Sequence, residues 1–469
     1  MRKSPNIRRR RGVIPAFSVL SFLALFLAAC GGGGSPSGHA GSATSANLTW
    51  WGWTPSVQVA QQYIKAFDKK YPDIHITFKM LTIAGYNAAI RPALASSVGP
   101  DIFDVAPGGA NGSVETYAPD AIDLGPAVQK ALGSDWQSKL SPIGVSSLTI
   151  GKKLAAVSVG AVYSGTVWIN QDLFQKYNLT PPTTLAQWVS DCATFKAHNI
   201  GCFVQGVGQT AFNEDTLQAI SDNIKPGVWA NAIDGKVPWT DPTIVKALTI
   251  WKSLFSDGIM EKGALGVQQY PDANNDFLSG KYAMVMMGTW YMQNTTTAGM
   301  SAGISGAGVS SPKKFTAMPI LFPNVAGTGT TGALYGDSDY GIAVNAKSKN
   351  QAAATKFAVW LGTSAEGQAQ VANALDDIAA LKGIQPDWSQ ISLVNAGSQQ
   401  AALSKLITSA VASSEPRLAT VSPNLQTAIG NASTTVASGS ATPAKAAAAL
   451  QAAAAALPNH GAIEPTPAG

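Results

Sequence analysis

The stretch that most constrains the fold covers residues 154–169, LAAVSVGAVYSGTVWI, and contains no charged side chain. Its residues are β-branched, small or aromatic, and Gly151 precedes it. A run of this composition predicts one long strand, or two strands, in a region buried on both faces. We therefore expect the chain to cross here from one lobe of the molecule to the other.

The residues after this run carry signals for the start of helices. Asn170 is placed to cap a short helix, and the prolines at 181 and 182 interrupt the chain before the next one. Thr184, with Gln187 three positions later, has the pattern of a capping box, in which each side chain accepts from the other residue's backbone N–H. The pattern predicts a helix over residues 184–198.

Strand and helix patterns alternate along the rest of the chain. The predicted strands include residues 47–51, 74–78, 102–105 and 339–344, and the predicted helices include residues 56–71, 86–97, 216–223, 242–257 and 350–361. Such alternation is typical of an α/β fold with a mainly parallel sheet and helices on both faces.

Three separate motifs resemble one protein family. They are VWINQDLF at 167–174 followed by PPTT at 181–184, FLSGKYAM at 277–284 with GTW at 288–290, and YGIAV at 340–344 with AATKF at 353–357. Their types and order resemble those of the family 1 extracellular solute-binding proteins, the group that includes maltose-binding protein. The resemblance implies a two-lobed α/β fold of the periplasmic-binding-protein type II kind, with hinge strands between the lobes.

Composition and resemblance together divide the chain into five predicted parts. These are a lipoprotein signal peptide at 1–29, a flexible tether at 30–46, a first lobe at 47–160 and 319–380, a second lobe at 161–318 and 381–457, and a disordered tail at 458–469. The tether follows from its Gly, Ser, Ala and Thr content. The resemblance alone places the residues after 380 on the second lobe.

The first 29 residues have the pattern of an export signal. Six basic side chains lie within residues 2–11, an apolar run begins at Val13, and Leu-Ala-Ala precedes Cys30. The run is short for a membrane span and contains Pro15, which favours a cleaved leader. Its end resembles the bacterial lipobox, which implies lipid modification of Cys30 and attachment to the outer face of the cell membrane. The arginine pairs leave twin-arginine export open.

The charge balance changes once this leader is removed. The whole chain has a formal charge of +5, but without the six basic residues of the leader 26 Lys and Arg face 27 Asp and Glu. This balance gives no sign of the clustered positive face that nucleic-acid binding requires. The remaining 440 residues exceed what one core normally supports, which also predicts two lobes.

The other two cysteines are Cys192 and Cys202. In an exported protein they can form a disulfide, although two buried free thiols remain an alternative because sequence does not fix the Cα separation. The four histidines have no second ligand at a usable spacing. We therefore expect no metal site and no cofactor.

Motifs of the common enzyme classes are missing or out of context. The sequence has no phosphate-binding loop and no Gly-x-Ser-x-Gly elbow. GTGTTG at 327–332 matches the dinucleotide fingerprint by letter, but no helix pattern follows it, so it is predicted to be a loop. The adjacent acids Glu214 and Asp215, and Asp376 and Asp377, are predicted to be solvated rather than catalytic. These observations favour a binding protein over an enzyme.

Tryptophans near strand ends are the first candidates for ligand contacts. Trp51 and Trp53 lie at and just after the end of the first predicted strand, and Trp290 follows the apolar residues 282–287. Ligands of doubly wound sheets bind beyond the carboxyl ends of strands, and an indole face suits the CH-rich face of a sugar. Either Trp50 or Trp51 should face the core instead, because neighbours on a strand point in opposite directions.

Polar residues in loops form the second group of candidates. Tyr335, Gly336 and Asp337 lie where the resemblance implies a ligand loop ahead of a strand, although a plain turn with solvated acids is an alternative. Asn111 follows the predicted strand at 102–105, in a loop where related sugar binders often have an acid or an aromatic residue. Gln209 is a weaker candidate.

The whole pattern predicts a membrane-tethered, monomeric protein that captures a neutral, hydroxyl-rich solute. A mono- or oligosaccharide would bind by hinge closure and pass to the membrane permease of an ABC transporter. One alternative is the same fold binding a polyamine, an amino acid or a phosphate ester, and Asp337 and Asp339 keep a cationic ligand open. The other alternative is an exported carbohydrate-active enzyme.

Overall fold

The computed structural model describes residues 42–463, apart from residues 110, 311–312, 329–331 and 419. The described residues all belong to one compact unit. The predicted leader, Cys30 and most of the predicted tether lie outside the described residues. The first strand begins at Ala46, one residue before the predicted start.

The first sheet has the strand order β2-β1-β3-β13-β6. Its strands are β1 (Ala46–Gly52), β2 (Ile74–Met80), β3 (Ile102–Val105), β13 (Gly341–Val344) and β6 (Val157–Ser158). β1 is parallel to β2 and β3, whereas β13 is antiparallel to both β3 and β6. The predicted parallel sheet is therefore parallel only in its N-terminal half, because β13 enters from a distant part of the chain.

Helices cover this first sheet and close its core. They are α1 (Val57–Lys70), α2 (Tyr86–Ala95), α3 (Val114–Tyr117), α4 (Gly125–Leu132), α5 (Trp136–Lys139), α6 (Pro142–Ser147), α14 (Gln351–Thr363) and α15 (Ala365–Ala374). Ser56 caps α1 by accepting from the Val59 N–H, as its residue type favours. α1 buries Tyr63 and Phe67, and the Phe67 ring packs edge-on against Phe357 of α14.

The second sheet has the order β11-β8-β10-β9. Its strands are β8 (Thr166–Asn170), β9 (Gly201–Val204), β10 (Tyr282–Met286) and β11 (Ala317–Leu321). The helices of this half are α7 (Gln171–Lys176), α8 (Leu185–Ala197), α9 (Ala211–Ile224), α10 (Val228–Ile233), α11 (Pro242–Ser256), α12 (Asn274–Leu278), α13 (Thr297–Gly306), α16 (Ala396–Val411), α17 (Pro423–Ala437) and α18 (Pro443–Ala455). α17 and α18 pack on α11, and α16 packs on β11, so the C-terminal helices belong to this half.

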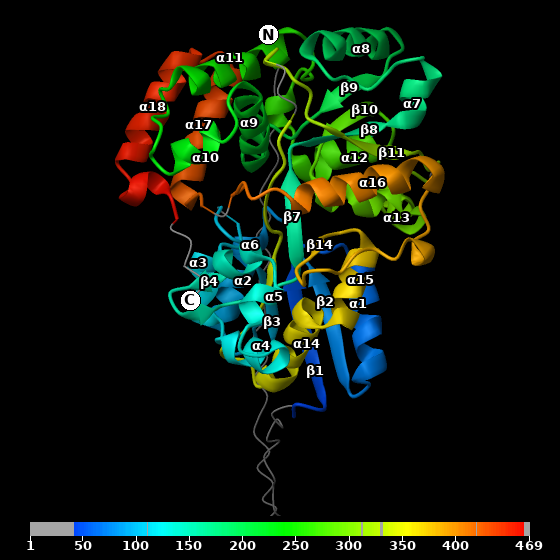
Figure 1. Ribbon diagram of the computed structural model, residues 1–469, viewed down its shortest axis with the longest axis vertical. Coiled ribbons are helices and arrows are strands. Elements are labelled where there is room, and N and C mark those ends of the chain that lie inside the picture. Colours follow the sequence, from blue (N-terminus) through cyan, green and yellow to red (C-terminus); the bar gives the residue numbers. More distant parts are fainter. Residues whose placement is uncertain (1–41, 110, 311–312, 329–331, 419, 464–469) are drawn as a thin grey trace, which may run out of the picture. The chain divides into compact units, whose positions relative to one another are not determined.

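A third, three-stranded sheet connects the two halves. It has the order β12-β7-β14, with β7 (Gly160–Ser164), β12 (Tyr335–Ser338) and β14 (Ile378–Ala379). β7 joins β6 to β8, β12 joins β11 to β13, and β14 joins α15 to α16, so the chain crosses between the halves three times. Figure 1 shows β7 and β14 between the two sheets. These are the hinge strands of the two-lobed α/β fold.

The uncharged stretch at 154–169 forms several short strands rather than one long strand. β4 (Thr149–Ile150) pairs with β5 (Lys153–Leu154), and β6, β7 and β8 follow. Gly165 separates β7 from β8 with φ +94°, and a Cβ there would lie 2.1 Å from the Ala333 carbonyl oxygen. Glycine is required at this bend because the backbone is left-handed and the neighbouring chain is close.

Two helix caps can be compared directly with their predictions. Thr184 accepts from the Gln187 N–H at 3.3 Å, but Gln187 Oε1 accepts from the Thr183 N–H at 3.0 Å instead of the Thr184 N–H. The reciprocal half of the capping box is therefore displaced by one residue. Asn170 caps α7 as predicted, by accepting from the Leu173 N–H.

Cys192 and Cys202 form a disulfide with a Cα–Cα distance of 4.9 Å. The bond ties α8 to the start of β9 in the second half. At the C-terminus, residues 458–461 form a short 3₁₀ turn, and Ala462 pairs with Val421. The first residues of the predicted disordered tail are thus packed against the second half, and residues 464–469 lie outside the described part. Within the described ranges, no helix has the length and apolar character needed to cross a membrane.

Candidate ligand-binding site

Trp290 lies at the carboxyl end of β10, in the 3₁₀ segment Thr289–Thr295. Its indole is half-buried, so it is not enclosed within the second half. The indole N–H donates to the Tyr270 hydroxyl at 3.1 Å, and the Phe212 ring centroid is 6.4 Å away. Three aromatic rings therefore meet at the position where the sequence predicts a ligand contact.

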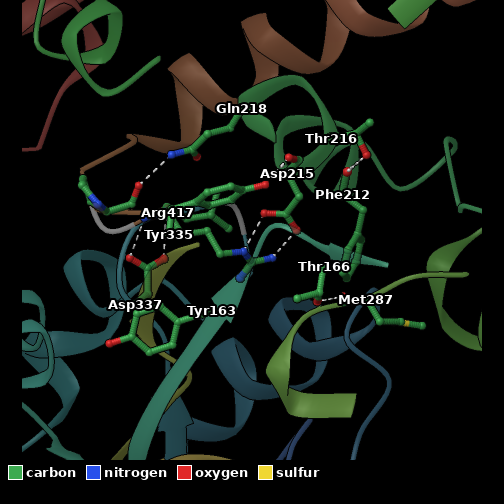
Figure 2. A network of polar contacts seen from close by, with 12 residues as sticks. Tyr163, Thr166, Phe212, Asp215, Thr216, Gln218, Met287, Tyr335, Asp337 and Arg417 are labelled. Atoms are coloured by element: carbon green, nitrogen blue, oxygen red, sulfur yellow. Dashed lines mark hydrogen bonds and ion pairs between the residues drawn. The ribbon is translucent and has the colours of Figure 1, made fainter. Parts of the chain in front are cut away.

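Arg417 covers Trp290 in this conformation. Its guanidinium carbon lies 4.9 Å from the indole centroid, within the range of a cation–π contact. The same guanidinium donates to both carboxylate oxygens of Asp215 at 2.7 Å, the fork-like geometry that arginine provides (Figure 2). Asp215 is 1% exposed and the Arg417 side chain is 12% exposed, so this is a largely buried ion pair.

The predicted ligand loop 335–337 holds the segment that carries Arg417. The Asp337 carboxylate accepts from the backbone N–H groups of Arg417 at 3.3 Å and Leu418 at 2.6 Å. Gly336 exchanges backbone hydrogen bonds with Glu415 and Arg417. Tyr335 is fully buried, and its hydroxyl donates to the Asp215 carbonyl oxygen.

These contacts change the interpretation of that loop. Asp337, predicted as an acceptor for ligand hydroxyls or as a solvated turn residue, is 3% exposed and acts here as a backbone acceptor. Tyr335 offers no surface to a ligand in this conformation because it is enclosed by the second-half core. Gly336 is necessary because a Cβ would lie 2.4 Å from the Tyr163 ring.

On the first half, Trp53 and Asn111 are neighbours in space. The half-buried Trp53 ring packs edge-on against Tyr86 at 4.7 Å. The ring also packs directly against the backbone of Gly112, where a hypothetical Cβ would lie 2.5 Å from the indole. The half-buried Asn111 precedes this glycine. The Gly109 N–H of the same loop donates to the Val421 carbonyl at 3.1 Å, so the loop meets the chain that follows Arg417.

The two remaining candidates differ in their placement. Gln209 Oε1 accepts from the Tyr270 N–H at 3.3 Å and therefore belongs to the Trp290 group. Trp51 lies on β1, where the Lys79 ammonium is 3.9 Å from its ring centroid. Trp50 is the member of the adjacent pair that faces the core, as alternation predicts, and its indole donates to Asp104 Oδ1 at 2.7 Å.

The two adjacent acid pairs are not solvated, so that prediction was wrong. Glu214, Asp215, Asp376 and Asp377 are each at most 2% exposed. Burial, reinforced by the Asp215 charge, raises the pKa of Glu214 to about 8. Tertiary packing, which no local pattern reveals, encloses both pairs between elements distant in sequence.

Asp376 and Asp377 belong to a group of four carboxyls, completed by Asp104 and Asp339, which we call the hinge carboxyl cluster. Burial is the main cause that raises the pKa of Asp104, Asp376 and Asp377 well above the ordinary carboxyl value. Burial also raises the pKa of Asp339 to about 6. Asp339 is the half-buried member, and it lies within hydrogen-bonding reach of Thr54 just beyond the end of β1.

A separate groove of about 560 Å³ runs between α1 and α15 on one side and residues 293–301 and 390–392 on the other. Its lining is uncharged and includes the amide side chains Gln58, Gln62, Gln293 and Asn373. None of the predicted ligand residues lines it. Gln293 connects it to the hinge carboxyl cluster, because its amide donates to Asp376 Oδ1.

Sequence reasoning missed Arg417, which organises the Trp290 group. One signal was present: after residue 11 the chain contains only two arginines, Arg91 and Arg417. A rare side chain suited to bidentate ion pairing is a reasonable candidate for a buried role. The described residues contain no cluster of three or more His, Cys, Asp or Glu side chains arranged to hold a metal.

The family is decided by comparison with known proteins. Residues 51–369 match the model of the bacterial extracellular solute-binding proteins. The chain belongs to this family. A member of this family binds its solute without transforming it, so this chain is a solute-binding protein and not an enzyme.

Several relatives agree with this assignment. The chain is 23% identical to the galactooligosaccharide-binding protein of Bacillus subtilis (strain 168) over 377 residues, which are 79% of this chain and 81% of the relative. A solved chitin oligosaccharide binding protein is 19% identical with a TM-score of 0.65, over 87% of this solute-binding protein and 98% of the other. Maltose-bound T. maritima MalE3 is 17% identical with a TM-score of 0.66, again over 87% and 98%. These solved structures share the fold.

Proposed function

We propose that this solute-binding protein captures a mono- or oligosaccharide by hinge closure. The observation that carries the proposal is the half-buried Trp290 indole at the end of β10, flanked by Tyr270 and Phe212. An indole in a fixed orientation gives the CH-rich face of a sugar a large apolar contact. The relatives that bind galactooligosaccharide, chitin oligosaccharide and maltose support this class.

Closure would use contacts from both halves. Trp290 and Gln209 come from the second half, and Trp53 and Asn111 from the first. A ligand can touch both groups at once only in the closed conformation, so it binds that conformation more tightly than the open one. This difference in affinity shifts the population toward the closed conformation. Arg417 has to remain beside the ligand or move from the indole face, since it covers that face now.

The proposal includes a cellular setting. Lipid modification of Cys30 would tether a monomer to the outer face of the cell membrane through residues 30–46. The closed form would then deliver the solute to the permease of an ABC transporter. The family match supports export and transport, and the lipobox supports the anchor.

A ligand screen of the protein without residues 1–46 tests the binding class. We expect oligosaccharides of galactose, xylose, glucose or N-acetylglucosamine to raise the melting temperature, because a ligand that binds only the native state stabilises it. Trp290→Ala should weaken the best ligand about tenfold or more, which corresponds to about 1.4 kcal/mol.

Trp388→Ala is the matched control for this screen. Trp388 is also half-buried and packs on the second half, in the short turn Trp388–Gln390. It should lower the melting temperature without weakening the ligand selectively. Stabilisation by amino acids or phosphate esters, with no response to any saccharide, would contradict the proposed class.

A further inference from the structure

The hinge carboxyl cluster is assembled around the start of the hinge strand β7. The Asp339 N–H donates to the Gly160 carbonyl at 3.2 Å. A Cβ on Gly160 would lie 2.4 Å from the Asp377 Cβ, so both acids pack against this glycine. Asp104, on β3, packs in the same way against Gly52 at the end of β1, with its Oδ2 1.9 Å from a hypothetical Cβ on that glycine.

Several oxygen atoms in this cluster lack a hydrogen-bond donor. Asp104, Asp376 and Asp377 are each at most 2% exposed. Trp50 donates to one oxygen of Asp104, and Gln293 donates to one oxygen of Asp376. Among the described residues, no hydrogen-bond partner reaches the other oxygen of Asp376, and the side-chain partner of the Asp377 carboxyl is another acid, Asp339. The Asp104 carboxyl also lies near the backbone N–H groups of Trp53 and Thr54. A buried carboxylate in this state is unstable unless it gains a proton, a donor or a cation.

The described side chains supply little positive charge to this cluster. The cation that acts on Asp339 is Arg417. Its guanidinium already makes two hydrogen bonds to Asp215, and Asp337 also acts on it. The other charges acting on Asp339, Asp376 and Asp377 are those of acids within the same group or beside it.

Building on the proposed carbohydrate function, we propose that the ligand is an amine-bearing saccharide whose ammonium group is received by Asp339, with Asp377 and Asp376 behind it. Asp339 is the member of the cluster with exposed surface, and it lies beside Thr54 at the end of β1. An ammonium group carries three donors and a compact positive charge, whereas a hydroxyl provides one donor and no charge. The amine therefore matches both the unpaired oxygens and the charge of the cluster.

Matched pairs of saccharides test this proposal on the unmodified protein. The free-amine disaccharide of glucosamine is compared with its N-acetylated form, and galactosamine with galactose, by calorimetric titration at pH 7. We expect the amine form to bind at least tenfold more tightly in at least one pair. This comparison does not depend on the folding of any variant.

Two variants then locate the effect. Asp339→Asn should abolish the preference for the amine, so that the two members of each pair bind with affinities within about threefold of each other. Asp73→Asn removes the same charge from an exposed position on the first half, and it should leave the preference unchanged.

The outcomes separate this proposal from the function on which it rests. Equal or tighter binding of the neutral saccharides overturns the amine proposal and keeps a sugar-binding function. An amine preference that survives Asp339→Asn overturns the assigned site. Binding of a polyamine such as spermidine, with no saccharide bound, overturns the carbohydrate function itself.

Discussion

Two polar clusters each include one acid from the segment 337–339, and they differ in how many of their carboxylate oxygens accept hydrogen bonds. Asp337 and Asp339 are two residues apart. Asp337 belongs to the cluster around Arg417, in which the guanidinium makes two hydrogen bonds to Asp215 and both Asp337 oxygens accept from backbone N–H groups. Asp339 belongs to the hinge carboxyl cluster, in which several oxygens have no partner. The first cluster maintains the fold, and the second leaves capacity for a ligand.

Removing Asp215 should produce the largest loss of stability, because it breaks the central ion pair of the first cluster. Asp215→Ala leaves the Arg417 guanidinium without its buried partner, which should lower the free energy of unfolding by about 3–5 kcal/mol. Urea denaturation at pH 7 measures this change. The double variant Asp215→Leu with Arg417→Met should recover most of it, because removing both charges avoids an unpaired one. A single variant as stable as the wild type would show that the pair is not structural.

Asp337→Ala should be the second most harmful change. It removes the acceptor from the backbone N–H groups of Arg417 and Leu418, and we expect a loss of about 2–3 kcal/mol in the free energy of unfolding. Asp73→Ala, at an exposed site, should change it by less than about 0.5 kcal/mol. Similar values for the two variants would remove the distinction between the clusters.

The hinge carboxyl cluster should make the stability of the protein depend on pH in the opposite sense from a carboxylate that is paired with a cation. Burial raises the pKa of Asp339 to about 6, so between about pH 4 and pH 6 the folded state binds more protons than the unfolded state. Stability in this window should therefore fall as the pH rises, by about 1–2 kcal/mol from this group.

Asp339→Asn should flatten that decline in urea denaturation across the window. The charged and titratable groups that act on Asp339 or lie around it include Asp104, Asp337, Asp376, Asp377, Tyr63, Tyr270 and Arg417. If the stability of the wild type rose across this window, in the same way as that of the Asp339→Asn variant, this assignment would be contradicted.

The smallest expected effect comes from Gln293, which donates to the cluster from the second half. Gln293→Met removes this donor and leaves another oxygen of Asp376 unpaired, which should cost about 1 kcal/mol at pH 7. The loss should be smaller at low pH than at high pH, because a protonated carboxyl depends less on a donor than an ionised one does. Gln62→Met changes another side chain that lines the same groove, on α1, and it should have no such pH dependence.

Local sequence patterns predicted the elements of the fold well. The starts of α1, α7 and α8 follow from Ser56, Asn170 and Thr184, because an N-cap acts on its own turn. The antiparallel entry of β13 into the first sheet was not predictable, because its register depends on pairing with β3 and β6, which lie far earlier in the sequence.

The candidate site was predicted less completely for the same reason. Trp290 and Trp53 could be selected because their positions after strands are local facts. The burial of Asp377 and the partner of Asp215 depend on β7 and on Arg417, which are far away in sequence. No periodicity in a short window distinguishes an exposed acid from one that a distant segment later covers.

The position of β13 in the first sheet has a consequence for how the protein matures. A ribosome or a secretion channel releases the chain from its N-terminus, so β1, β2 and β3 emerge long before Val344 completes the strand that pairs with β3. Until then β3 keeps an unpaired side, and the other lobe still lacks α17 and α18. Both lobes thus become complete only late in synthesis, which favours a polypeptide that stays unfolded during transit and folds after release.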